Sequence, residues 1–61
     1  MSYRIDIRGA NGTTVANKMS TRSLRECAQW IYDKGYTTQG NLVVGKQIAT
    51  RNGIEFSVEV S

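Results

Sequence analysis

The sequence has no histidine, no proline and a single cysteine, and these shortages exclude several kinds of site. Without histidine, neither a Ser-His nor a Cys-His catalytic pair can form. A structural zinc site needs about four cysteine or histidine ligands, whereas Cys27 is the one such residue in the chain. A lone cysteine also leaves no internal disulfide, which favours a reducing compartment such as the cytoplasm. We therefore expect a cytoplasmic protein that holds no metal and no cofactor.

Long apolar runs and paired carboxylates are also scarce. No run approaches the roughly 18 apolar residues of a membrane span. Glu55 and Glu59 are predicted to share one strand face, where four strand residues separate them by about 13 Å. Glycosidase carboxylates lie about 5–9.5 Å apart, so this pair does not match such a site. The sequence therefore predicts that the protein is not an enzyme.

The length of 61 residues, of which 39% are hydrophobic, is enough for one small core. Compact domains begin near about 50 residues, so we expect a single domain over residues 1–61. At this size a core alone rarely supplies more than about 3–5 kcal/mol of stability. Each local stabilising device in the chain should therefore have a measurable effect.

The first part of the chain predicts a β-hairpin. Residues 3–8 alternate between apolar and charged side chains, as expected of a strand with one buried face. Residues 9–12 then read Gly-Ala-Asn-Gly, which favours a turn. A second, weaker strand is predicted over residues 13–19, with Val15 and Met19 expected to point inward.

The middle of the chain predicts a helix over residues 24–34. Ser23 lies three residues before Glu26, the spacing of a capping box. Gly35 suits the left-handed residue that ends many helices, and Tyr36 follows as the apolar residue of a Schellman ending. The expected apolar stripe has helical spacing and comprises Leu24, Cys27, Ala28, Ile31 and Tyr32.

The last part predicts a second hairpin, with strands over residues 42–50 and 54–60. A two-residue turn at Asn52 and Gly53 would place Ala49 opposite Phe56. A three-residue loop over residues 51–53, with a bulge at its glycine, would instead pair Ile48 with Phe56 and Val44 with Val60. The second register pairs apolar with apolar residues, so we predict the three-residue loop.

These elements predict an α+β fold with the order ββαββ, a four-stranded antiparallel sheet of two hairpins with the helix packed on one face. The other face of the sheet would remain open to solvent. As an architecture, this plan resembles that of several small phage-encoded inhibitors of host enzymes. The resemblance implies a protein that binds a larger partner, and it concerns the architecture alone, with no shared motif.

Basic charge is concentrated in the first part of the chain. Residues 1–25 hold five basic residues and one acid, whereas residues 26–61 hold three basic residues and four acids. We therefore expect a surface that attracts phosphates or an acidic protein.

Trp30 lies about 240° from Leu24 around the helix, off the expected stripe, so it either packs on the sheet edge or anchors a partner. The candidate partner-binding residues are Arg4, Arg8, Lys18, Arg22, Arg25 and Trp30.

Two functions fit this pattern. The first is a non-enzymatic protein-binding module, a small accessory or inhibitor protein of the kind phages and mobile elements encode, docking on a larger host enzyme or nucleoprotein complex. The second is a small basic nucleic-acid-binding protein that uses the first hairpin. Against the second function, the sequence lacks paired aromatic residues on a strand that could stack on bases, and its excess of basic charge is modest.

Overall fold

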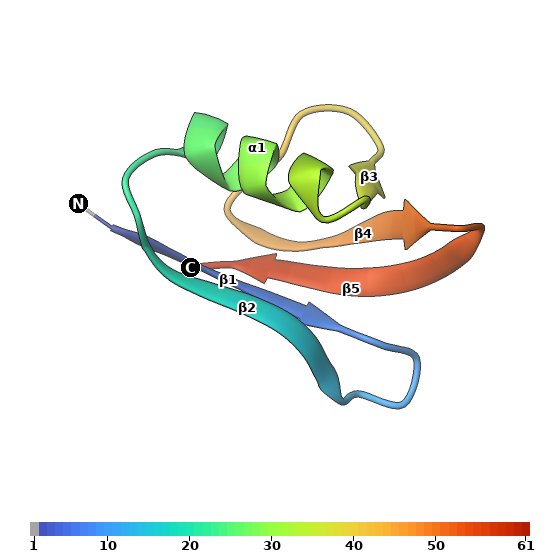
Figure 1. Cartoon of the computed structure of the whole chain (residues 1–61). Helices are drawn as coiled ribbons and strands as arrows, with labels where there is room; N and C mark the ends of the chain where they lie inside the picture. The colour runs from blue at the N-terminus through green and yellow to red at the C-terminus, as the bar shows by residue number, and fades with distance from the viewer. Residues whose placement is uncertain (1) are drawn as a thin grey trace.

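A computed structural model describes residues 2–61 as one helix packed on one face of an antiparallel sheet (Figure 1). The α+β class is therefore confirmed. The sheet has five strands, however, in the order β2-β1-β5-β4-β3. In chain order the elements are β1 (Tyr3–Arg8), β2 (Thr14–Thr21), α1 (Leu24–Asp33), β3 (Thr37–Thr38), β4 (Gly45–Arg51) and β5 (Ile54–Val60).

The prediction of four strands is wrong because of β3, which was expected to be loop. Thr37 and Thr38 pair with Thr50 and Ala49 at the free edge of β4. Two residues are too few to produce a recognisable alternation in sequence. The two hairpins join through β1 and β5, with Ile7 opposite Val58.

Strand β2 corrects the predicted inward residues of the first hairpin. Val15 and Met19 are 51% and 59% exposed, whereas Thr21 is buried. The register against β1 shifts near both ends of β2, and Ser20 has a left-handed φ of 63°. An extra residue in a strand reverses the faces of the side chains beyond it. The positions of the apolar residues in β2 therefore do not predict which face of this strand is buried.

Helix α1 begins at the predicted residue and ends at Asp33, one residue before the predicted end, with Lys34 as its C-cap. The Ser23 hydroxyl accepts the Glu26 N–H at 3.2 Å, while the Glu26 carboxylate accepts the N–H of Arg22 at 3.0 Å. The second arm of the capping box thus reaches one residue further back than the motif requires. At the other end the Tyr36 N–H donates to the Ile31 carbonyl at 3.1 Å. Gly35 has φ 93°, which completes the Schellman ending.

The second hairpin has the two-residue turn, so the predicted three-residue loop is wrong. Asn52 and Gly53 have φ values of 54° and 77°, as in the type I′ turn that suits the twist of paired strands. Ala49 consequently lies opposite Phe56, and Ile48 faces solvent beside Ser57 with 47% of its surface exposed. The geometry of the Asn-Gly turn outweighed the pairing of apolar residues.

The buried core shows that α1 is rotated about its axis relative to the predicted stripe. Cys27 and Ile31 are buried as expected, but Ala28 and Tyr32 are exposed. Trp30, expected off the stripe, is half-buried and packs against the core. The core comprises Ile5, Ile7, Cys27, Ile31, Tyr36, Leu42, Ala49, Val58 and Val60.

A candidate docking groove beside the helix

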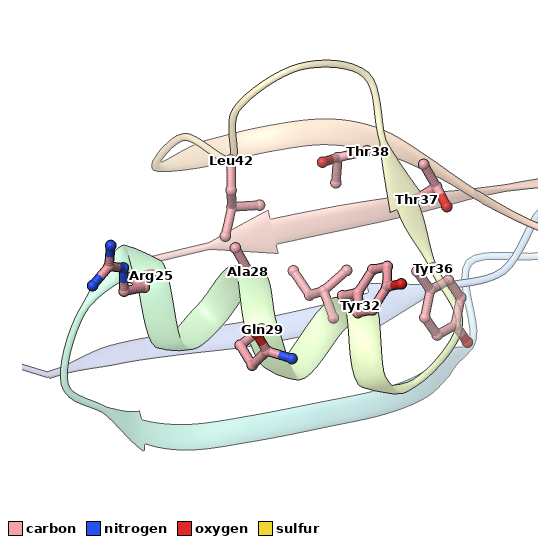
Figure 2. Close-up of a pocket in the computed structure, with 9 residues that line it drawn as sticks. Arg25, Ala28, Gln29, Tyr32, Tyr36, Thr37, Thr38 and Leu42 are labelled. Atoms are coloured by element: carbon pink, nitrogen blue, oxygen red, sulfur yellow. The ribbon is translucent and has the colours of Figure 1, made fainter.

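An apolar groove of about 380 Å³ runs between α1 and the segment that contains β3 and Leu42 (Figure 2). Its floor is formed by buried side chains, those of Ile31, Tyr36 and Leu42. Figure 2 shows Leu42 pointing across the groove toward Ala28 on the helix. The complete lining is Arg25, Ala28, Gln29, Ile31, Tyr32, Tyr36, Thr37, Thr38 and Leu42. We call this feature the Tyr32 groove.

Tyr32 is the most exposed large hydrophobic side chain of the groove. It is 72% exposed, yet it belongs to the rigid third turn of α1, close to the Schellman ending. Tyrosine is enriched among the residues that dominate protein interfaces because it offers a large rigid ring and a polar tip. An exposed ring on a helix beside an apolar floor can receive an apolar side chain from another molecule.

Local structure holds the wall opposite the helix in place. Strand β3 is paired with β4, and the Thr38 hydroxyl donates to the Gly40 carbonyl at 3.1 Å. Further along, the Val43 N–H donates to the Gln47 side-chain oxygen at 3.0 Å. The segment that forms this wall is therefore hydrogen-bonded near its beginning and near its end, which favours a preformed site.

The other side of α1 carries a second depression of about 350 Å³ around Trp30, lined by charged residues of both signs. Lys18 lies opposite Ile5 and so is on the helix side of the sheet, where it lines this depression together with Arg22. The Trp30 ring packs against the core on one side, and the Lys34 ammonium lies 5.6 Å from its centre. We call this feature the Trp30 hollow. Its tryptophan is largely occupied by contacts within the chain.

The open face of the sheet carries the remaining predicted arginines. Alternation places Arg4 and Arg8 away from the buried Ile5 and Ile7. The Arg8 guanidinium donates to Asp6 at 2.7 Å, and this hydrogen bond holds the pKa of the Asp6 carboxyl below its usual value. Asp6 itself lies opposite Glu59. The open face thus mixes both signs of charge and does not form a basic patch.

The six predicted site residues fall on three surfaces of the molecule. Lys18, Arg22 and Trp30 share the Trp30 hollow, and Arg25 lines the Tyr32 groove. Arg4 and Arg8 lie on the open face of the sheet. Tyr32 was expected on the buried stripe of the helix and is instead exposed. The size of Trp30 was the available signal, because the largest apolar ring of a helix tends to set which side is buried.

The described residues contain little that suggests chemistry at a metal or a nucleophile. Residues 2–61 hold no cluster of three or more side chains suited to a metal ion. Cys27 is buried, and burial raises the pKa of its thiol, which disfavours the reactive thiolate. Among these same residues, no helix is long and apolar enough to cross a membrane.

Comparison with known proteins adds no family. A scan against protein-family models finds no match, and searches among curated proteins and among solved structures find none either. The geometry of the chain itself therefore carries the functional argument.

Proposed function

We propose that this protein is a non-enzymatic binding module that docks on a larger protein through the Tyr32 groove. The supporting observation is the 72% exposed Tyr32 beside an apolar floor. A site of this size lies within the range of about 300–1,000 Å³ that is typical of ligand pockets. Tyr32 would anchor the partner, while basic residues around α1 steer its approach.

The proposed class of function is the one expected from the sequence, but the residue that anchors the partner is Tyr32 instead of Trp30. Trp30 was the expected contact, but its ring is engaged by the core and by Lys34. The role proposed is that of an accessory or inhibitor protein acting in the cytoplasm, in which the module occupies a surface of a larger enzyme or nucleoprotein complex. Arg22 and Lys18 would contribute long-range attraction for an acidic partner.

The alternative of nucleic-acid binding by the first hairpin has weaker support. Arg8 is neutralised by Asp6, and Lys46 lies opposite Glu59 on the same open face. Binding to nucleic acid draws most of its affinity from unpaired basic groups that displace counterions. A face with alternating charge provides few of these.

A capture experiment with matched variants tests the proposal. The immobilised protein is exposed to lysate of the source cells, with and without nuclease treatment, in parallel with Tyr32→Ala and Met19→Ala. Met19 is the control because it is a large exposed side chain on β2. We expect Met19→Ala to capture the same protein as the parent does. Tyr32→Ala should weaken the binding of that protein by about 2 kcal/mol or more.

Two results would contradict the proposal. If Tyr32→Ala captures the partner as strongly as the parent does, the groove is not the docking site. Capture that disappears after nuclease treatment, and that weakens steeply as salt is raised, would favour the nucleic-acid alternative.

A further inference from the structure

We infer that the Tyr32 groove binds an extended segment of a partner protein that carries an apolar residue and, two positions away, a carboxylate paired with Arg25. This inference rests on the proposed function and names the chemistry of the partner. It follows from the charge in the groove, from its length and from the residues that the chain itself exposes.

The charge in the groove is a single cation. Arg25 is the one charged side chain among the lining residues, and within residues 2–61 it makes no ion pair. The nearby acids have other partners: Glu26 accepts the Arg22 N–H, and Asp33 accepts a hydrogen bond from Gln29 at 2.8 Å. An unpaired guanidinium at the end of an apolar surface is complementary to a carboxylate joined to an apolar group.

The length of the groove sets the spacing of the segment. Arg25 and Tyr32 are seven residues apart on α1, which corresponds to about 10 Å along the helix axis. Two positions of extended chain span about 7 Å, at about 3.3 Å each. The long side chain of Arg25 covers the remaining distance of about 3 Å, because its stem of methylene groups lets the guanidinium reach along the groove. Side chains two positions apart point to the same side of an extended segment. An apolar side chain at Tyr32 therefore places the carboxylate toward Arg25, near the positive end of the helix dipole.

A second copy of this chain does not supply the required pattern. The exposed large apolar residues are Val15, Met19, Tyr32, Val43, Val44, Ile48 and Ile54. None of them has an acidic residue two positions away in either direction. The net charge of +3 also disfavours association between two copies. The occupant is therefore a segment of a different, acidic protein.

A pair of peptides that differ in one group tests the inference directly. The probes are acetylated and amidated tripeptides, Leu-Ser-Glu and its neutral counterpart Leu-Ser-Gln, with Leu-Glu-Ser as the control for spacing. Each is titrated against the ¹⁵N-labelled protein and followed by NMR. We expect Leu-Ser-Glu to shift the amides of Arg25, Ala28, Tyr32 and Leu42. It should bind about two- to fivefold more tightly than either other peptide, the effect of an exposed ion pair.

Variants on two surfaces of the molecule assign the effect to one residue. Arg25→Gln should make the Glu and Gln peptides bind equally, whereas Lys46→Gln, on the open face of the sheet, should leave their difference intact. Equal binding of the two peptides to the parent protein would overturn the inference while leaving the proposed function to the capture experiment. Shifts confined to other surfaces would overturn it, as would a groove occupied by a second copy at rising protein concentration. If Tyr32→Ala fails to reduce capture, the proposed function fails, whatever the peptides show.

Discussion

Each side of α1 carries one aromatic residue, and the two residues differ in how far they are buried. Trp30 on one side is half-buried against the core and covered by Lys34, whereas Tyr32 on the other side is left 72% exposed over an apolar groove. A helix of ten residues on a small sheet can bury one side well. The side that was buried holds the larger ring, since aromatic rings contribute most of their stabilisation through the area they remove from water.

The difference shows how this small protein can keep an exposed aromatic ring without losing its core. Tyr32 is absent from the buried cluster, which continues beneath it through Ile31, Tyr36 and Leu42. The rings of Tyr36 and Phe56 meet edge to face, with their centres 5.1 Å apart. The floor of the groove is therefore part of the core, while its rim is free to bind. Stability and binding should respond to different substitutions on the same helix.

The largest expected effect is the loss of stability in Trp30→Ala. Removing a half-buried indole should cost about 2–3 kcal/mol, somewhat below the roughly 3–5 kcal/mol of a fully buried aromatic residue. This is a large part of the stability expected for a chain of this size. Urea denaturation measures the change, and Trp30→Phe should recover much of the loss. An unchanged unfolding midpoint would show that Trp30 is not packed, which would remove the contrast between the two sides.

The helix cap should have the next largest effect. Ser23→Ala leaves the Glu26 N–H without its acceptor and should cost about 0.5–2 kcal/mol. Because the cap supports the whole first turn, both sides of α1 should weaken together. Helical circular dichroism during urea unfolding measures this loss, and Ser23→Asp should restore most of it. If Ser23→Ala and the parent unfold at the same urea concentration, another residue caps the helix.

The third effect is confined to alkaline solution and comes from Cys27, between the two sides of the helix. Burial raises the pKa of its thiol in the folded state above the ordinary value of 9.0. The unfolded chain then loses its thiol proton at a lower pH than the folded chain does. The stability contributed by Cys27 is therefore fully present below pH 9.0 and is lost as the pH rises through the folded pKa.

Denaturation curves at several alkaline pH values test this effect against Cys27→Ala. The parent should lose more stability with rising pH than the variant does, because the variant has no thiol to titrate. The Ala variant starts from a lower stability, so the slopes with pH are compared rather than the absolute values. Parallel slopes would contradict a buried thiol at this position.

The smallest expected change in stability is that of Tyr32→Ala. Because Tyr32 is mostly exposed, its removal should alter the free energy of unfolding by no more than about 0.5 kcal/mol. The measurement is the same urea denaturation that is used for Trp30→Ala. A loss comparable to that of Trp30→Ala would mean that the Tyr32 ring packs on the core, and it would then be a poor anchor for a partner.

Residues close together in sequence made much of this protein predictable. The alternation in β1, the Gly-rich turn after it and both ends of α1 were correctly predicted, because each depends on neighbours within about five residues. The register of the second hairpin was wrong even though Asn52 and Gly53 are adjacent, since apolar pairing was given more weight than turn geometry. The signal for the correct turn was present in the chain.

The candidate site was less predictable than the elements that form it. Arg25 was named, but its groove depends on Leu42, which was expected within a strand and instead enters the core from the segment before β4. The inward positions of β4 are Gly45, Gln47 and Ala49. Two of these residues are small, and Leu42 and Tyr36 belong to the same buried cluster as Ala49. No local sequence pattern predicts that these side chains pack together, because they come from residues that are far apart in the chain.

The sequence by itself therefore determined that two hairpins flank one helix, and how the helix begins and ends, through hydrogen bonds and backbone preferences between near neighbours. Only the tertiary structure decided which side of α1 is buried, that β3 extends the sheet, and that the predicted basic residues separate onto three surfaces. The physical reason is that burial depends on the volume left between the helix and the sheet. That volume is set jointly by residues distant in sequence, so Trp30 filled one side while Tyr32 remained at the surface.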